Sequence, residues 1–265
     1  MKFKQFINEA SKEDMANDVF DNLLRDIKKD CGPFLNDSYM PIYRGRHGLN
    51  TWKKEIARDN RLPKDSAEDM FFNNIFNMAI EEISGIPEIR KKALFCTRDY
   101  SQAYGYGNVC YVFPIGKPNF IYGNRVYDSY DDVSSYALRK AIMKSIGQPF
   151  NKKGPITSIL DYAANEYGVD VQSLEKLFDK VDIEKVLKAL KETFTDEFGY
   201  VVTDNVTKME KDKSRLNGEI MLVGSPAYYV VNVNYAAKWL DMSDDDSAKY
   251  VENVYRALAD AAHEI

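Results

Sequence analysis

Residues 217–233 read NGEIMLVGSPAYYVVNV, and this segment sets the fold class of the chain. Glu219 to Val223 and Tyr228 to Val233 are rich in β-branched, aliphatic and aromatic residues, which favour strands. Gly224-Ser225-Pro226 lies between them and is typical of a turn. The segment therefore predicts two neighbouring strands, with the carboxylate of Glu219 at the start of the first.

Further short strands are predicted wherever a brief apolar or β-branched run is bounded by glycine, proline or polar residues. They cover Pro41–Gly45, Ala93–Thr97, Val109–Ile115, Phe120–Tyr122 and Tyr200–Thr203. Apolar residues at helical spacing predict helices. These cover 8–29, 66–84, 182–195, 234–242 and 247–263, with shorter ones over 51–59 and 101–106. Cys31-Gly32-Pro33 is expected to end the first helix, because glycine and proline terminate helices.

Strands near both ends of the sequence with helices between them predict an α+β fold. Residues 128–196 are helical and charged in pattern, so we expect them to form a helical insertion within a single domain of residues 10–265. The chain has 265 residues, of which 45% are hydrophobic, and this is enough apolar material for a substantial core.

Composition narrows the function classes. The net charge of −5 gives no general attraction to nucleic acids or anionic membranes, and no run approaches the ~20 apolar residues of a membrane span. Since His47 and His263 are the only histidines, we expect no metal site, and a Ser-His-Asp or Cys-His arrangement would have to use one of these two. The three cysteines, Cys31, Cys96 and Cys110, form no CxxC pair, so free buried thiols in a reducing compartment are expected.

The first ten residues, MKFKQFINEA, are similar to the capsid-targeting leaders of internal head proteins in T-even-type phages. Such leaders begin with lysine and aromatic residues and are cut after a Leu/Ile-x-Glu triplet, which Ile7-Asn8-Glu9 matches. The resemblance implies a cleaved leader over residues 1–9 and packaging of the protein in a phage head. The alternative is the first turn of an amphipathic helix.

Three segments combine groups suited to ligand binding or catalysis. In the first, Ile42 to Gly45, an arginine ends a strand. Its planar guanidinium matches a pair of phosphate oxygens, and the adjacent glycine allows close approach of a ligand. Arg46 would share the face of Arg44 if the strand continues. The alternative is a surface arginine beside a turn.

The second segment, residues 94–107, reads LFCTRDYSQAYGYG and predicts a strand, a polar turn and a short helix. Such a turn presents hydroxyls and backbone donors together, and its tyrosines are suited to stacking on a flat ring. In the third segment, Glu219 stands at the mouth of an apolar strand, where a carboxylate can stabilise positive charge in a transition state. The alternatives are aromatics that only pack in the core and a charged residue at a strand edge.

In this order, the three segments resemble the ADP-ribosyltransferase superfamily, whose pattern is an arginine on one strand, a Ser/Thr motif on a second and a glutamate on a third. Asn217 to Leu222 is similar to the glutamate strand of bacterial Rho-modifying exoenzymes, and Arg61 to Ser66 is similar to a stretch in phage proteins of this type. The resemblance implies a split β core with helical N-terminal, middle and C-terminal segments, and NAD as the substrate.

The resemblance also assigns roles to single residues. Glu219 would stabilise an oxocarbenium-like transition state, Thr97 would position Glu219 or the ribose, and Asn217 would face the acceptor. Arg44 would hold the diphosphate, and a tyrosine would stack near the nicotinamide. The residues expected to bind NAD are Arg44, Gly45, Arg46, Tyr100 and Tyr106.

Two positions depart from the family pattern. The usual Ser-Thr-Ser is Cys96-Thr97-Arg98 here, and Asn217 stands where arginine-modifying members carry Glu or Gln. Arginine is therefore disfavoured as the acceptor, which leaves Asn, Gln, Ser, Thr, nucleic acid or water. The expected enzyme is a mono-ADP-ribosyltransferase that modifies a host macromolecule, a protein first of all, in the bacterial cytoplasm. The alternatives are a catalytically silent relative that inhibits a host factor and a packaged virion protein.

Overall fold

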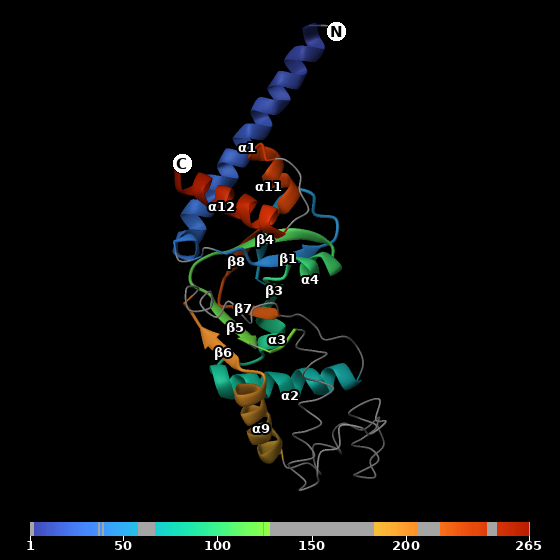
Figure 1. The fold of residues 1–265 in the computed structure, drawn as a ribbon, viewed down its shortest axis with the longest axis vertical. Coiled ribbons are helices and arrows are strands. Elements are labelled where there is room, and N and C mark those ends of the chain that lie inside the picture. The colour runs from blue at the N-terminus through green and yellow to red at the C-terminus, as the bar shows by residue number, and fades with distance from the viewer. Residues whose placement is uncertain are drawn as a thin grey trace.

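The computed structural model describes residues 3–36, 38, 40–57, 67–123, 125–127, 183–205, 218–242 and 248–264. Its centre is an eight-stranded sheet in which every neighbouring pair of strands is antiparallel. Helices lie on both sides of this sheet (Figure 1), so the predicted α+β fold is confirmed.

The strands match the sequence predictions in all but one case. Their order across the sheet is β2-β8-β4-β1-β3-β7-β5-β6. Their bounds are β1 Tyr43–Arg46, β2 Trp52–Ile56, β3 Leu94–Thr97, β4 Asn108–Pro114, β5 Asn119–Gly123, β6 Tyr200–Thr203, β7 Glu219–Val223 and β8 Ala227–Asn232.

The exception is β2, because the prediction of a helix over 51–59 is wrong. Lysine and glutamate favour helices locally, but the edge of β8 offers backbone partners along the whole strand, from Trp52 opposite Val231 to Ile56 opposite Ala227. Two side-chain contacts reinforce the extended form: Lys54 pairs with Asp30 at 2.8 Å, and Glu55 pairs with Arg46. Tertiary contacts therefore outweigh local propensity in this segment.

The sheet divides into two halves between β1 and β3, where a single residue pair, Tyr43 opposite Thr97, holds them together. Buried residues of both halves join in one apolar core. From the first half it includes Cys110, Val112 and Val230, and from the second Leu94, Cys96, Ile220 and Leu222. The two halves therefore share one core, although a single residue pair joins β1 to β3.

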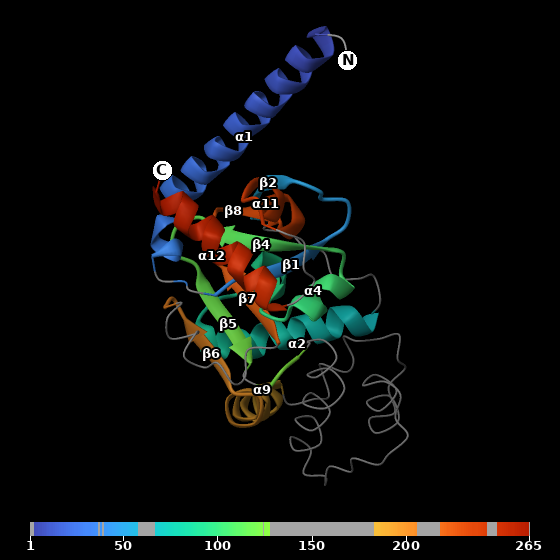
Figure 2. The same ribbon diagram turned by 45° about the horizontal axis from the view of Figure 1, so that its top comes forward.

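Helices cover the outer faces of the two halves. Their bounds are α1 Phe3–Leu35, α2 Ala67–Ser84, α3 Ile89–Lys92, α4 Tyr100–Gly105, α9 Ile183–Glu192, α11 Val233–Trp239 and α12 Ala248–Glu264. Tyr255 of α12 packs on Tyr111 and Phe113 of β4, with ring centroids 5.5 and 5.7 Å apart. On the other side, Phe76 of α2 lies 5.6 Å from Phe194, beside α9 (Figure 2).

The first helix is longer than predicted at both ends. It continues through Cys31-Gly32-Pro33 to Leu35, where Cys31, Phe34 and Leu35 are 0%, 2% and 4% exposed. Burial of such side chains is worth ~1.5–3 kcal/mol each, which offsets the ~3 kcal/mol cost of a proline in a helix. At its other end, α1 projects beyond the rest of the fold (Figure 2), and Ile7-Asn8-Glu9 lies within the helix.

The helical prediction for 182–195 is confirmed by α9 and by the π-helical turn Thr193–Glu197 that follows it. The rest of the predicted insertion, 128–182, lies outside the described residues. Within the part of the chain that is described, no helix is both long and apolar enough to cross a membrane.

The three cysteines are free and buried, as predicted. Burial raises the pKa of each thiol to about 12. A group whose pKa is raised in the folded state contributes stability below its unfolded pKa, and this contribution is lost as the pH rises toward the folded value. The thiols should therefore stabilise the fold up to about pH 9 and progressively less between pH 9 and 12.

We expect the unfolding temperature to fall between pH 8 and pH 10.5, and the fall to be smaller in a variant with all three cysteines replaced by alanine. Thermal unfolding followed by circular dichroism at both pH values checks this. Buried tyrosines contribute to the same trend, so the difference between the two proteins is the quantity to measure. An equal fall in both would show that the thiols do not contribute.

Candidate functional site

The three segments singled out in the sequence lie side by side in the fold. The strands β1, β3 and β7, which carry Arg44, Thr97 and Glu219, are consecutive neighbours in the sheet. Tyr43 is opposite Thr97, and Thr97 is opposite Glu219. Tyr43, Thr97 and Glu219 therefore form a row across three neighbouring strands, and Arg44 is the residue after Tyr43.

Glu219 is held in place from two sides. Its backbone N–H donates to the carbonyl of Tyr127 at 3.1 Å, and the same carbonyl accepts a hydrogen bond from Gln102 Nε2 at 2.8 Å. A Cβ on the preceding Gly218 would lie 1.7 Å from the Val126 carbonyl oxygen, so the chain passes too closely for any other residue. One carboxylate oxygen of Glu219, Oε1, is buried. The backbone that carries this carboxylate is thus fixed at the start of β7.

The predicted strand, turn and helix over residues 94–107 are confirmed. Thr97 is buried, and its hydroxyl accepts a hydrogen bond from the Asp99 N–H at 3.0 Å. Asp99 caps α4 by accepting from the N–H groups of Ser101 and Gln102 at 2.8 and 3.0 Å. These bonds leave the Thr97 O–H able to donate.

The tyrosines and the glycine proposed for NAD binding are contacted by other parts of the protein. The Tyr100 ring meets Tyr43 edge-on at 6.1 Å. Tyr106 is 57% exposed, but its backbone and Cβ cover Gly45. A Cβ on Gly45 would lie 2.2 Å from the Ala103 carbonyl oxygen, so helix α4 occupies the space that the sequence suggested for a ligand.

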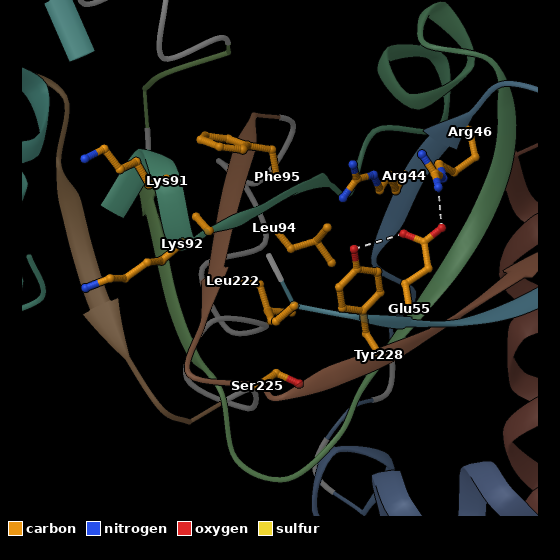
Figure 3. A pocket seen from close by; sticks show the side chains of 12 residues that line it. Arg44, Arg46, Glu55, Lys91, Lys92, Leu94, Phe95, Leu222, Ser225 and Tyr228 are labelled. Atoms are coloured by element: carbon orange, nitrogen blue, oxygen red, sulfur yellow. Dashed lines mark hydrogen bonds and ion pairs between the residues drawn. The ribbon is translucent and has the colours of Figure 1, made fainter. Parts of the chain in front are cut away.

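Arg44 lines a cavity of about 270 Å³ that lies between the two halves of the sheet (Figure 3). Its walls are formed by Arg44, Arg46, Glu55, Ala57, Lys91, Lys92, Ala93, Leu94, Phe95, Leu222, Ser225 and Tyr228. Figure 3 shows the Arg44 side chain directed toward Phe95 and Leu94, whereas Lys91 and Lys92 extend away from it. The cavity therefore combines an inward guanidinium with walls that are partly polar and partly apolar.

Two of the other charges in this cavity, those of Arg46 and Glu55, compensate each other. Arg46 forms an ion pair with Glu55, and the Tyr228 hydroxyl donates to the same carboxylate at 3.0 Å. Burial is the main cause that raises the pKa of Tyr228 to about 12, so it remains a donor at neutral pH. Within the described part of the chain, Arg44 makes no hydrogen bond or ion pair. Arg44 is therefore available to an anion.

Glu219 and Thr97 do not line this cavity. Side chains alternate along a strand, so Arg44 points away from the face of Tyr43, which is the face of the Thr97–Glu219 row. The charges of Arg44 and Glu219 both act on the thiol of Cys96. Its pKa is raised by burial first, then lowered by Arg44 and raised by Glu219, so both charges are within electrostatic reach of this thiol.

Several residues around the cavity were not predicted. Glu55, Lys91 and Lys92 lie in segments where the sequence carries no distinctive motif, and the extended form of β2 is what brings Glu55 to Arg46. Asn217, the residue expected to face the acceptor, lies outside the described residues, as do Arg61 and Ser66.

The described residues contain no group of three or more histidine, cysteine, aspartate or glutamate side chains that could hold a metal ion. Comparison with known proteins adds no assignment: no family model, no curated protein and no solved structure matches this chain.

Proposed function

We propose that the chain is a mono-ADP-ribosyltransferase that cleaves NAD between nicotinamide and ribose and transfers ADP-ribose to a host macromolecule. The observation that supports this most is the adjacency of β1, β3 and β7, with Thr97 opposite Glu219 and Arg44 one residue from the same row. A split β core of the ADP-ribosyltransferase type is part of the proposal, and the single residue pair between β1 and β3 is consistent with it.

In the proposed reaction, the bond between the ribose carbon and the nicotinamide nitrogen breaks, and its electron pair neutralises the pyridinium. The ribose becomes oxocarbenium-like, and the carboxylate of Glu219 stabilises this positive charge. The acceptor then attacks the same carbon and loses a proton to solvent. Thr97 would position Glu219 or the ribose, and Arg44 would hold the diphosphate.

The remaining roles are secondary. Arg46 would support Arg44 through the pair that it makes with Glu55. Tyr106, which is exposed, is better placed than Tyr100 to stack on a ligand ring, because the Tyr100 ring packs on Tyr43. Asn217 would face the acceptor, and its lack of a carboxylate disfavours arginine as the modified residue.

The proposal is tested by incubating the purified protein with NAD and a bacterial lysate and measuring free nicotinamide and ADP-ribosylated products by mass spectrometry. Nicotinamide release together with a mass increment on a macromolecule would support a transferase. Release without a modified acceptor would indicate an NAD hydrolase. No release from protein shown to be folded would contradict both.

A second candidate function is a catalytically silent relative that binds a host factor. The observation that favours it is that Arg44 and the Thr97–Glu219 row lie on different faces of their strands, with Cys96 and Arg98 in place of the usual serines. This reading predicts a folded protein that captures a host protein equally well with or without Glu219 and releases no nicotinamide.

The proposed place of action is the bacterial cytoplasm, after entry with phage DNA. The only support for packaging is the resemblance of residues 1–9 to a capsid leader. N-terminal sequencing of the protein from purified virions tests it: a chain that begins at Ala10 supports a leader cut after Glu9, and a chain that begins at Met1 contradicts it.

A further inference from the structure

Strand β2 forms one edge of the sheet, and among the described strands its only neighbour is β8. The pairing continues beyond both ends of β2. The Thr51 carbonyl accepts a hydrogen bond from the Asn232 N–H at 2.8 Å, and the Ala57 N–H donates to the Pro226 carbonyl at 3.0 Å. Hydrogen-bonded positions alternate along an antiparallel strand. The odd-numbered residues of β2 therefore direct their backbone groups toward β8, and the even-numbered residues direct theirs away from the sheet.

The outward-facing residues are Trp52, Lys54 and Ile56, and their backbone N–H and C=O groups make β2 a template for another strand. The Ile56 side chain is 79% exposed, the largest exposure of any large hydrophobic side chain in the described part of the chain. Lys53 and Lys54 are exposed as well. An exposed apolar side chain on an open sheet edge favours strand addition, in which a further strand extends the sheet.

The two faces of β2 carry different chemistry. Lys53 and Glu55 lie on the face of the cavity, because Glu55 belongs to the cavity wall (Figure 3) and side chains alternate along the strand. The opposite face carries Trp52, whose ring lies 6.3 Å from that of Tyr229. One face of the strand thus has a cation and an anion, and the other has an apolar side chain at each end.

The sequence of β2, WKKEI, is complementary to a second copy of itself in the antiparallel direction. A two-fold axis through Lys54 places Trp52 opposite Ile56 of the partner subunit. The same axis places Lys53 opposite Glu55 of the partner subunit. Both the apolar ends and the opposite charges of the strand are then matched across the axis, and such cross-strand pairs stabilise a sheet.

The neighbouring registers are less favourable. A shift of the axis by one residue would place Lys53 opposite its own copy in one direction and Glu55 opposite its own copy in the other. Like charges directly opposite each other destabilise a sheet. In the register centred on Lys54, this lysine also faces its own copy, but Asp30 lies 2.8 Å from it within the same chain and compensates its charge.

We infer that the chain forms a symmetric dimer through β2, in which the two edge strands pair antiparallel around Lys54 and join the two sheets into one. The outward-facing backbone groups of the even-numbered residues supply the hydrogen bonds across the axis. Lys53 and the partner's Glu55 then occupy a non-hydrogen-bonded pair, where opposite side chains lie closest. The inference is independent of the proposed function. Since Glu55 lines the cavity, the dimer brings the partner's Lys53 to the cavity wall.

The molar mass of the full chain in solution, measured by sedimentation velocity over a range of concentrations, tests the inference. The mass should rise with concentration from the 30.4 kDa of one chain toward twice that value. Ile56→Lys should weaken dimerisation on the order of tenfold or more, because it removes the apolar contact with the partner's Trp52 and adds a charge. Lys53→Glu should weaken dimerisation as well, because it places two carboxylates opposite each other.

Lys188→Glu on α9 is the matched control for Lys53→Glu, since it makes the same change in net charge at an exposed lysine of another element. It should leave dimerisation unchanged. Folding of every variant is checked by circular dichroism. A chain that stays monomeric at every concentration would overturn the inference, and the lysines would then serve to protect the edge from pairing. A dimer that is insensitive to Ile56→Lys, or equal losses in Lys53→Glu and Lys188→Glu, would also overturn it.

Oxidative cross-linking tests the register. In a hydrogen-bonded antiparallel pair the two Cα atoms are about 5.5 Å apart, which a disulfide can span, so Lys54→Cys should give a cross-linked dimer. In Lys53→Cys the introduced cysteines would be diagonal to each other at about 7–8 Å, at or beyond the ~7 Å limit for a disulfide, and should cross-link poorly. The native cysteines are buried and do not compete. Cross-linking of Lys53→Cys in preference to Lys54→Cys would overturn the proposed pairing.

Discussion

Replacing Glu219 by glutamine should lower the turnover number for nicotinamide release on the order of 100-fold or more, with little change in KM. The substitution keeps the size and the backbone hydrogen bond to Tyr127, which is made by the N–H of residue 219. It removes only the negative charge that stabilises the ribose cation, and that charge acts mainly in the transition state. Initial rates of nicotinamide release over a range of NAD concentrations measure both constants.

Glu184→Gln on α9 is the control for a change in net charge, because Glu184 is exposed on a helix that does not belong to the site. It should leave both kinetic constants unchanged. A Glu219→Gln protein with full turnover would exclude Glu219 as the catalytic carboxylate. A raised KM with normal turnover would instead show that Glu219 contributes equally to ground-state and transition-state binding.

The sequence contains enough information to place the strands that carry the site. Each of β1, β3 and β7 is a short apolar run next to glycine or a polar turn, and such runs are visible without a structure. The sequence does not contain the pairing between them. That Thr97 lies opposite Glu219, while Arg44 is one residue out of this row, depends on register, and a shift of one residue would reverse the face of every side chain.

The errors have one physical origin, which is that long-range contacts outweigh local preference. Residues 52–56 have helix-forming side chains but form β2, because β8 provides a free edge. Pro33 lies within α1, because Phe34 and Leu35 are buried in the core. The cavity depends on the extended form of β2, because that form brings Glu55 to Arg46 and into the wall of the cavity.

Gly45 is the position where sequence and structure give different reasons for the same residue. The sequence suggests that glycine admits a ligand to the backbone, but the space above it is filled by α4. The Ala103 carbonyl oxygen would lie 2.2 Å from an added Cβ, and the Tyr106 Cβ would lie 2.6 Å from it. Neither is the end of a flexible side chain, so α4 would have to move away from β1.

We therefore expect Gly45→Ala to lower the free energy of unfolding by about 3 kcal/mol, as measured by urea denaturation, because overpacking against backbone forces a shift of α4. Gly105→Ala is the matched control within α4, since a Cβ there has no neighbour within 4 Å. It should leave stability unchanged or raise it by up to ~1 kcal/mol, as alanine favours helices over glycine. Equal effects of the two substitutions would contradict the close approach of α4 to β1. A stable Gly45→Ala protein that fails to bind NAD would restore the role in ligand binding that the sequence suggests.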